Sequence, residues 1–404
     1  MPSFEEAGRT ILEHVAPLGA EVVPILDALG RVLAGDLAAP SDAPAWNNSA
    51  MDGYAVRAEE VRGGAALRLS AYLPAGAPGA DPLARGTAAK ILTGAPLPAG
   101  ADAVVPVEEA EERDGLVFAR GDVRPGAHVR RRGEDVRAGE IVLRAGAVVG
   151  PAEISWLASS SRLLVPVHRR PRVAILSTGD ELVPPGEALG PGKIHDSNTL
   201  AVAAAATDAG AVPTFLGIAR DERAPLRALL AEGLRADVLV TSAGVSMGDR
   251  DLVRQGLEEL GARQVFWKID VKPGRPTAFA LAGTTPVFSL PGNPVSTLLT
   301  FEEFVRPALL RMAGRRDLFR PTVRAALQDG LARKPGRVSL VRVRLERRGG
   351  ELLAFSAGNQ ETGILSTLLR SDGIAIVPAD RGDVRPGAAV DVQVLRGGLE
   401  PWRA

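Results

Sequence analysis

The runs VAILSTGDEL (173–182), VLVTSAGVSMGDRD (238–251) and VFSLPGNPVST (287–297) decide the fold of this chain. Each begins as a short apolar segment and ends abruptly in glycine and small polar residues. This pattern is typical of a buried strand followed by a loop rich in backbone N–H groups. In open α/β sheets, ligands bind just beyond the carboxyl ends of the strands. We therefore expect a pocket for a phosphate-bearing ligand where the three runs end.

Residues 172–312 alternate between strand and helix patterns, which predicts a parallel sheet with helices on both faces. Between the first two runs we expect a helix at 199–209, a strand at 212–219 and a helix at 222–235. Asn198 is expected to cap the first of these helices and Gly210 to end it.

The flanking segments have a different character. Residues 3–28 have apolar residues at helical spacing, with a break at 17–19, and a further helix is expected from Pro151 to Ser161. Residues 29–140 consist of short strand patterns separated by Gly/Pro turns. From about Pro321 the alternation predicts a small β-barrel or sandwich.

Composition excludes several classes of site. The 404 residues include 48 basic and 48 acidic side chains, so no net field gathers nucleic acid or anionic membrane. There is no cysteine and the four histidines are scattered, so any divalent ion would rest on carboxylates and ligand phosphates, which suits Mg²⁺. No run approaches membrane-spanning length and no signal peptide is recognisable, so a soluble cytoplasmic protein is expected.

Three segments could bind an anion. In SLPGNPVST, Asn293 and Pro294 suit a helix start, and Gly292 permits close backbone approach to a ligand; a capped turn without ligand is the alternative. The glycine-rich TSAGVSMGDRD could be a phosphate loop or an ordinary surface turn. In FWKIDVKPGRP, a strand would put Lys268, Asp270 and Lys272 on one face, with Arg275 in the following turn, although charge clusters are usually solvated.

Carboxylates follow two of the predicted strands. Asp180 and Glu181 end the first run, and Asp221 stands in an equivalent place after 212–219. They could bind a metal, position water or cap helices. The sequence has no Walker A loop, GxGxxG fingerprint or Ser-His-Asp arrangement, which disfavours P-loop ATPases and Rossmann dehydrogenases.

Eight strings in order give the chain a resemblance to one family. They are NSAMDGYAV (48–56), KILTGAPLPAGADAVVPVEE (90–109), RRRGED (130–135), STGDEL (177–182), IHDSN (194–198), SAGVSMGDRD (242–251), FWKIDVKPGRP (266–276) and SLPGNPVS (289–296). Together they resemble the molybdopterin molybdenumtransferases, bacterial relatives of the gephyrin E domain. The string GRVSLVR, with Arg337 and Arg342, departs from the family pattern.

The resemblance implies an elongated homodimer of multidomain α/β plus β architecture. Its parts would be a helical dimerisation domain (1–28 and 141–170, with part of 42–50), a β-rich domain (29–140), a three-layer molybdopterin-binding-like α/β domain (171–318) and a C-terminal β-barrel (319–404). The implied partners are a molybdopterin adenylyltransferase as substrate donor and a downstream molybdoenzyme or carrier, with neither nucleic acid nor membrane.

The implied reaction inserts molybdate into the dithiolene of adenylylated molybdopterin, cleaves its pyrophosphate bond and releases AMP with the help of Mg²⁺. The catalytic positions that carry over are Asp52, Thr93, Asp135, Glu181, Asp221, Asp251, Lys268 and Lys272, the first three facing the pocket from the neighbouring subunit. Glu181, Asp221 and Asp251 are the implied metal ligands.

Substrate-binding positions come from the same strings, except for Ser366, which comes from GNQETGILSTLLRSDG (358–373), a segment that fits the family pattern only loosely. They are Ser177, Thr178, Ser242, Gly244, Ser246, Arg275, Pro276, Pro291, Gly292, Asn293, Ser296 and Ser366. Two other functions stay open at this stage. A non-catalytic molybdopterin-binding scaffold would fit the gephyrin relation, and an adenylyltransferase of the single-domain type would explain only 172–312.

Overall fold

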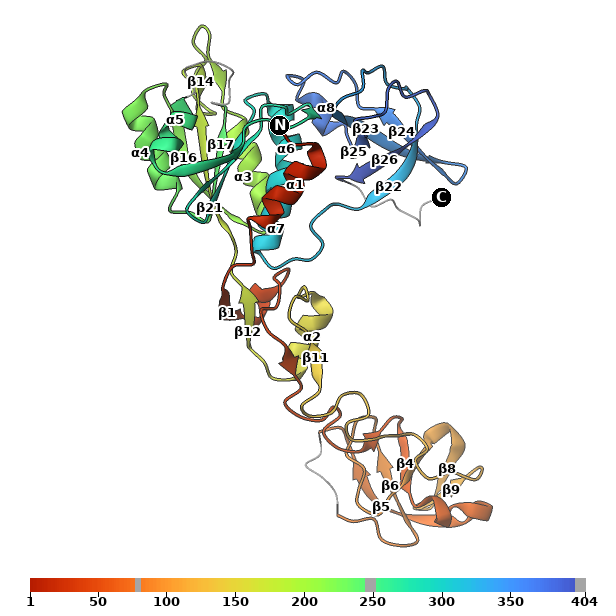
Figure 1. The fold of residues 1–404 in the computed structure, drawn as a ribbon. Helices are drawn as coiled ribbons and strands as arrows, with labels where there is room; N and C mark the ends of the chain where they lie inside the picture. Colours follow the sequence, from red (N-terminus) through yellow and green to blue (C-terminus); the bar gives the residue numbers. More distant parts are fainter. Residues whose placement is uncertain (77–80, 244–251, 397–404) are drawn as a thin grey trace. The chain divides into compact units, whose positions relative to one another are not determined.

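A computed structural model describes residues 1–76, 81–243 and 252–396, which fold into two compact units (Figure 1). The large unit spans residues 1–34, 146–150 and 164–404, and the small unit spans 35–145 and 151–163. No helix in this described part is long and apolar enough to cross a lipid bilayer. The finer division into four domains stays a prediction.

A six-stranded sheet forms the centre of the large unit. Its order is β16 (Val212–Ala219), β13 (Arg172–Thr178), β17 (Val238–Ser242), β21 (Thr285–Leu290), β20 (Ala278–Ala282) and β18 (Ala262–Phe266). The first four strands are parallel, which confirms the prediction made from the three apolar runs. β20 is antiparallel to both β21 and β18, so β18 again runs in the common direction. The carboxyl ends of five strands therefore meet at one edge of the sheet.

Helices cover both faces of this sheet, as predicted. Val173 and Ile175 of β13 join a core cluster with residues of one helical layer, and Ala174 and Leu176 join a second cluster with the other. The first layer contains α3 (Asn198–Asp208), α6 (Pro294–Thr300), the π-helical turn η5 (Phe301–Val305) and α7 (Arg306–Met312); the second contains α4 (Arg223–Gly233) and α5 (Leu252–Glu259). Alternate residues of a strand point to opposite faces, so a doubly covered strand must be apolar throughout.

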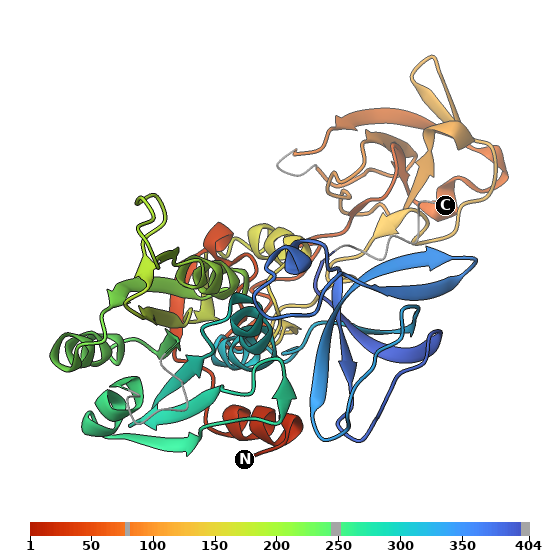
Figure 2. The same cartoon turned by 90° about the horizontal axis from the view of Figure 1, so that it is seen from above.

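The C-terminal segment forms a closed barrel rather than a sandwich. Its strands are β22 (Thr322–Leu327), β23 (Val338–Arg348), β24 (Glu351–Ser356), β25 (Gly373–Val377) and β26 (Ala388–Val394), with α8 (Ser366–Leu369) in a connection. β23 pairs with both β24 and β25, which closes the ring. Val341 and Val343 point into the barrel core, whereas Val338 and Leu340 on the opposite face pack into the core of the sheet. Figure 2 shows the barrel, in blue, beside the helices of the sheet.

A short strand joins the barrel to the central sheet. β19 (Val271–Lys272) lies in the connection between β18 and β20, and it pairs in parallel with Val338 and Ser339 of β23.

The N-terminal segment is only partly helical, so the prediction of a helix pattern over 3–28 is wrong beyond its first half. α1 (Phe4–Glu13) begins at a capping box between Ser3 and Glu6 and buries Ala7 and Ile11. β1 (Ala20–Pro24) then pairs with β12 (Leu164–His168), and η1 (Ile25–Ala28) is a 3₁₀ turn. Pro and Gly in 17–19 end the helix, and the β-branched pair Val22-Val23 suits a strand. The short strands β14 (Leu182–Val183) and β15 (Ile194–His195) complete the large unit.

The small unit is β-rich, as predicted. Its main sheet has the order β7 (Ala103–Pro106), β4 (Gly53–Val56), β6 (Thr87–Ile91), β5 (Ala66–Leu73), β9 (Leu116–Ala119) and β8 (Ala110–Arg113). Two further strand pairs join β10 (Val129–Arg130) to β3 (Asn48–Ser49) and β11 (Ile141–Leu143) to β2 (Leu37–Ala38), and α2 (Pro151–Ser159) is its helix. The 3₁₀ turns are η2 (Ala58–Glu60), η3 (Arg62–Gly64) and η4 (Val107–Glu109).

Candidate functional site

The carboxyl edge of the central sheet brings several predicted residues together. Ser177 of β13 lies opposite Ser242 of β17, which in turn lies opposite Leu290 of β21. Ser177, Thr178 and Ser242 are buried polar residues, and Pro291 and Gly292 follow Leu290 directly. The loop 267–277 connects β18 to β20 at this same edge, so it adds Lys268, Lys272, Arg275 and Pro276.

Asn198 links two parts of this edge. Its Nδ2 donates hydrogen bonds to Ser242 Oγ at 2.8 Å and to the Gly292 carbonyl at 2.7 Å. Both amide hydrogens are therefore used to hold the end of β17 to the β21–α6 loop. The predicted capping role is wrong: Asn198 is the first residue of α3, and the N-cap Ser197 makes no side-chain cap bond.

A buried chain of hydroxyl groups fixes the orientation of Ser177. Thr199 Oγ1 donates to Asp196 Oδ2 at 2.5 Å, while Thr199 N donates to Asp196 Oδ1 at 3.1 Å. The Ser177 hydroxyl lies 2.7 Å from Thr199 Oγ1. A hydroxyl carries only one hydrogen, so Thr199 must accept from Ser177. Asp196 and Asn198 belong to the string IHDSN, but the sequence alone does not predict a role at the site for them or for Thr199.

The start of α6 differs from its prediction in one respect. Asn293 occupies the N-cap position and Pro294 the first helical position, but the Asn293 side chain makes no capping hydrogen bond. The Asn293 carbonyl accepts from Thr297 N at 2.9 Å, and Val295 N donates to the Thr362 carbonyl of the barrel domain at 3.4 Å. Ser296 is buried in the first turn. The barrel domain therefore lies directly against this turn.

The KPGRP loop is packed on α6 rather than extended as one strand. β18 ends at Phe266 and β19 contains only Val271 and Lys272, so the predicted single strand from Lys268 to Lys272 is wrong. The loop turns back on itself, since Ile269 N donates to the Arg275 carbonyl at 3.0 Å. Lys272 and Arg275 are exposed and Lys268 is half-buried. Both lysines nonetheless belong to one loop at the carboxyl edge.

Arg342 of β23 is a charged residue in the interior of the described structure. It is fully buried, and its Nη2 donates to the carbonyls of Asn359 and Glu361 at 3.1 and 3.3 Å. Its Nε and Nη1 are buried without a hydrogen-bond partner among the described residues. Burial alone lowers the pKa of Arg342, since no carboxylate of the described residues opposes it. Arg342 shares its strand face with Val338 and Leu340, so it points toward the sheet domain.

Three carboxylates gather at the ends of β13 and β16. Asp221 N donates to Asp180 Oδ1 at 3.3 Å, and the Arg220 guanidinium donates to the Asp180 carbonyl at 3.1 Å. Burial raises the pKa of Asp221, and the negative charges of Asp180 and Glu181 raise it further. A cation placed among these groups would relieve their repulsion. Within the described residues, no group of three or more potential ligands is arranged around a metal position.

Asp52 and Thr93 form a contact pair in the small unit. Asp52 Oδ1 accepts hydrogen bonds from Thr93 N and Thr93 Oγ1, both at 2.7 Å. These two bonds lower the pKa of Asp52. Asp135 N donates to the Ala43 carbonyl at 3.1 Å, and the Asp135 side chain is exposed. The three predicted residues of this unit are thus solvent-accessible or paired with each other.

The remaining predicted residues lie outside the carboxyl edge or outside the described chain. Ser366 is the exposed first residue of α8 in the barrel domain. Gly244, Ser246 and Asp251 lie outside the described residues.

Comparisons with known proteins cover nearly the whole chain. Residues 2–161 match the model of the MoeA N-terminal region (domain I and II), residues 174–311 that of a probable molybdopterin binding domain, and residues 324–395 that of the MoeA C-terminal region (domain IV). The chain is 37% identical to molybdopterin molybdenumtransferase 2 of Mycobacterium tuberculosis over 97% of its own length and 99% of the relative's. It is 36% identical to the molybdopterin molybdenumtransferase of a Nostoc species, over 98% and 94% of the two chains.

Solved structures agree with this assignment. Two crystal structures of the molybdopterin biosynthesis MoeA protein of Pyrococcus horikoshii superpose with TM-scores of 0.86 and 0.82, at 32% and 28% identity. Each superposition covers 98% of this chain and 99% or 100% of the other. The chain therefore belongs to the MoeA family, the family of the molybdopterin molybdenumtransferases.

Proposed function

We propose that this chain acts in molybdenum cofactor biosynthesis as a molybdopterin molybdenumtransferase. Its substrates would be adenylylated molybdopterin and molybdate. The two dithiolene thiols would bind molybdenum in place of one oxo group, which leaves with the two thiol protons as water. One water would add to the adenylyl phosphorus as the pyrophosphate P–O bond breaks, so that AMP leaves and the phosphate stays on molybdopterin. Support comes from family membership and from one observation above all. Arg342 lies on the strand that pairs with Lys272, and two nitrogen atoms of its buried guanidinium have no hydrogen-bond partner among the described residues.

The charges at the carboxyl edge suit these substrates. A diphosphate bound beside a tetrahedral dianion concentrates negative charge, which fixed cations stabilise in a partly dehydrated site. Lys268, Lys272 and Arg275 come from one loop, and Arg342 adds a guanidinium whose fork geometry matches an oxyanion. Since the chain has no cysteine, its own residues would act by positioning and electrostatic stabilisation.

The carboxylates fit a magnesium ion better than a softer metal. Mg²⁺ is usually held by one or two carboxylates together with substrate phosphates, and the mutual repulsion of Glu181 and Asp221 is what a hard cation would offset. Glu181 and Asp221, with Asp251, would hold the ion. When bound, it would supply Lewis acidity toward a phosphate oxygen.

We further propose that the active form is a cytoplasmic homodimer. Asp52, Thr93 and Asp135 would then serve the pocket of the neighbouring subunit. A molybdopterin adenylyltransferase would deliver the substrate, and a carrier or molybdoenzyme would take the product. These partners follow from the chemistry of substrate and product, both of which are reactive dithiolenes.

An AMP-release assay tests the proposal. Purified protein is mixed with adenylylated molybdopterin and Mg²⁺, with and without molybdate, and AMP is quantified. We expect molybdate to accelerate release, and Lys272→Ala to reduce the molybdate-dependent rate at least tenfold. Lys334→Ala, which changes an exposed lysine of the barrel domain, is the matched control. A folded protein that binds molybdopterin but releases no AMP would favour the scaffold function instead.

A further inference from the structure

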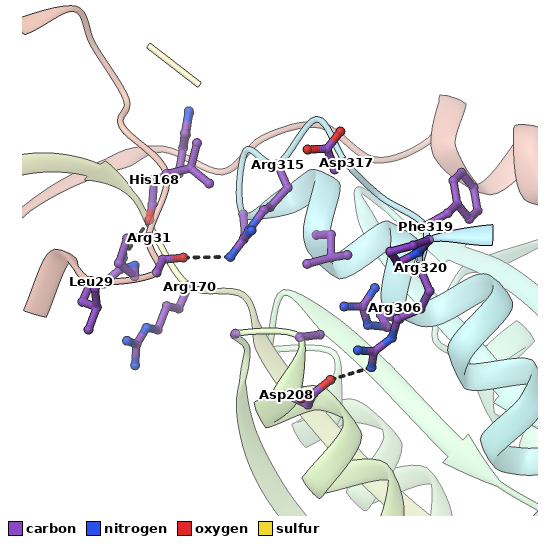
Figure 3. A pocket seen from close by; sticks show the side chains of 17 residues that line it. Leu29, Arg31, His168, Arg170, Asp208, Arg306, Arg315, Asp317, Phe319 and Arg320 are labelled. Carbon is purple, nitrogen blue, oxygen red and sulfur yellow. Dashed lines mark hydrogen bonds and ion pairs between the residues drawn. The ribbon is translucent and has the colours of Figure 1, made fainter. Parts of the chain in front are cut away.

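A cavity lies at the end of the central sheet opposite the candidate functional site. It has a volume of about 410 Å³ and is lined by residues from the end of β12, the end of α3, and α7 with the segment after it (Figure 3). Arg170 comes two residues before the start of β13, and Gly210 comes two residues before β16. The cavity therefore borders the amino ends of strands whose carboxyl ends form the candidate active site. Its volume is within the usual range for small-molecule sites.

Arginine dominates the lining of this cavity, which we call the arginine pocket. Five arginines face two aspartates, Asp208 and Asp317; the arginines are Arg31, Arg170, Arg306, Arg315 and Arg320. Leu29 and Phe319 supply apolar walls, and about half of each side chain is exposed. A charged wall beside an apolar wall suits a small organic molecule that carries a phosphate.

The arginines are only partly neutralised by the protein. Arg320 donates to Asp208 Oδ2 at 2.7 Å and to Glu302 Oε1 at 2.9 Å. The same Glu302 oxygen is also the nearest carboxylate oxygen of Arg306, at 3.5 Å. Arg315 donates to a neutral group, the carbonyl of Gly30, at 3.0 Å. Glu302 is thus shared by the guanidinium groups of Arg306 and Arg320. Arg315 has no carboxylate partner among the described residues.

Arg306 is mostly buried and incompletely hydrogen-bonded within the described part of the chain. Only 13% of its side chain is exposed, and its Nε is buried without a hydrogen-bond partner among the described residues. Burial lowers the pKa of Arg306, and the neighbouring positive charges of Arg320 and Arg315 add to that effect, against Glu302 and Asp208. In Figure 3 the guanidinium groups of Arg306 and Arg320 lie side by side. Such a cluster is stabilised by a bound anion.

The arginines of the pocket do not gather there to cap the C-terminal ends of helices. α3 and α7 both end at this cavity, and cations are favourable near the carbonyls of a helix C-terminus. However, among the described residues no guanidinium of the pocket donates to a carbonyl in the last turn of either helix. Arg315 bonds to Gly30, and Arg31 bonds to Glu21 and to the His168 carbonyl. The guanidinium groups face the cavity instead of capping the helices.

We propose that the arginine pocket is a second anion site, which binds a phosphate-bearing small molecule at the sheet edge opposite the candidate active site. Arg306 and Arg320 would contact the phosphate, with Arg315 and Arg170 at the entrance. The apolar side chains of Leu29 and Phe319 would contact the rest of the ligand. This site is independent of the reaction proposed above.

Calorimetric titration with inorganic pyrophosphate tests the site. The double variant Arg170→Gln/Arg315→Gln removes two charges at the entrance and leaves Arg306 and Arg320 unchanged. The control Arg324→Gln/Arg348→Gln removes two exposed charges from the barrel domain, so the net charge of both proteins is equal. A third variant, Lys272→Gln/Arg275→Gln, removes two of the four cations proposed to bind anions at the carboxyl edge.

We expect the pocket variant to weaken one pyrophosphate binding event at least tenfold, while the control binds as the parent does. The carboxyl-edge variant should keep that event. The proposal is overturned if the pocket variant and the control bind alike, or if the carboxyl-edge variant abolishes all binding. Melting temperatures measured for all four proteins ensure that a loss of binding is not a loss of fold.

Discussion

Gly274 lies so close to Thr300 that a Cβ added to the glycine would be 2.3 Å from Thr300 Cγ2. Gly274 also has φ of 107°, a conformation that other residues rarely adopt. The contact holds the KPGRP loop on the first helix of the α6–α7 segment. Lys272 and Arg275 stand on either side of the glycine, so this contact sets where both cations lie.

Gly274→Ala should therefore damage both stability and activity. Strained backbone and steric overlap act together, and we expect the free energy of unfolding to fall by about 2–4 kcal/mol. Molybdate-dependent AMP release should fall as well. Gly283→Ala is the control, since Gly283 has φ of 59° but nothing within 4 Å of the added Cβ. Equal losses in the two variants, measured by urea denaturation, would show that the contact with Thr300 is unimportant.

Asn198→Ala should loosen the carboxyl edge. The variant frees Ser242 Oγ and the Gly292 carbonyl at once, and we expect AMP release to slow about tenfold with a stability loss of about 1–3 kcal/mol. Thr207→Ala removes one side-chain hydrogen bond from the far end of the same helix and is the control. If both variants retain full turnover, the two bonds of Asn198 do not position the site.

Arg342→Met distinguishes a functional from a structural arginine. The change removes a buried charge, but it also leaves the carbonyls of Asn359 and Glu361 without the donor Nη2. We expect the free energy of unfolding to fall by about 1–3 kcal/mol, while the KM for molybdate rises at least tenfold. A large loss of stability with unchanged KM would assign Arg342 to barrel structure alone.

Glu303 should make stability depend on pH. Burial raises the pKa of Glu303 to about 8, and the charge of Glu302 adds to this. The unfolded carboxyl loses its proton near 4.5, so between about 4.5 and 8 the folded state binds one more proton than the unfolded state. Stability contributed by this group is thus complete at low pH and declines as pH rises, by about 1.4 kcal/mol per unit.

Glu303→Gln should remove this dependence and be more stable than the parent at pH 8. Denaturation curves at pH 5, 6, 7 and 8 measure the difference between the two proteins. A difference that stays constant across this range would mean that Glu303 is already ionised in the fold.

Subunit sharing can be tested by mixing inactive variants. If Asp52 serves the neighbouring pocket, a heterodimer of Asp52→Ala and Lys272→Ala subunits contains one intact pocket. We expect about a quarter of the parental AMP-release rate after statistical exchange, because half of the dimers are mixed and each has one of two sites. No recovery, despite subunit exchange shown by native mass spectrometry, would place both residues in one chain's site.

The apolar runs predicted the central sheet well because burial on both faces leaves few alternatives for a strand such as 173–178. The N-terminal prediction failed for a related reason. Residues 20–24 have an apolar spacing that fits a helix, and only the partner strand 164–168, far away in sequence, decides in favour of β1. Short segments without a local partner are decided by tertiary contacts.

The candidate site shows the same limit. One charged string is enough to predict Lys272 and Arg275 as site residues, whereas the sequence predicts only a capping role for Asn198, because local spacing shows only the helix that follows it. Its true partners, Ser242 and Gly292, are 44 and 94 residues away. The sequence could not predict either that Arg342 has no carboxylate partner among the described residues, because this depends on how the barrel folds around it.

The pairing of β19 with β23 connects Lys272 to two domains. Its loop begins and ends in strands of the α/β sheet, while its own strand pairs with a strand of the barrel. A rigid-body rotation of the barrel would therefore also move Lys272 and change the position of its positive charge at the carboxyl edge of the sheet. Transferring the α/β domain alone into another protein would therefore remove the barrel strand that holds Lys272 in position.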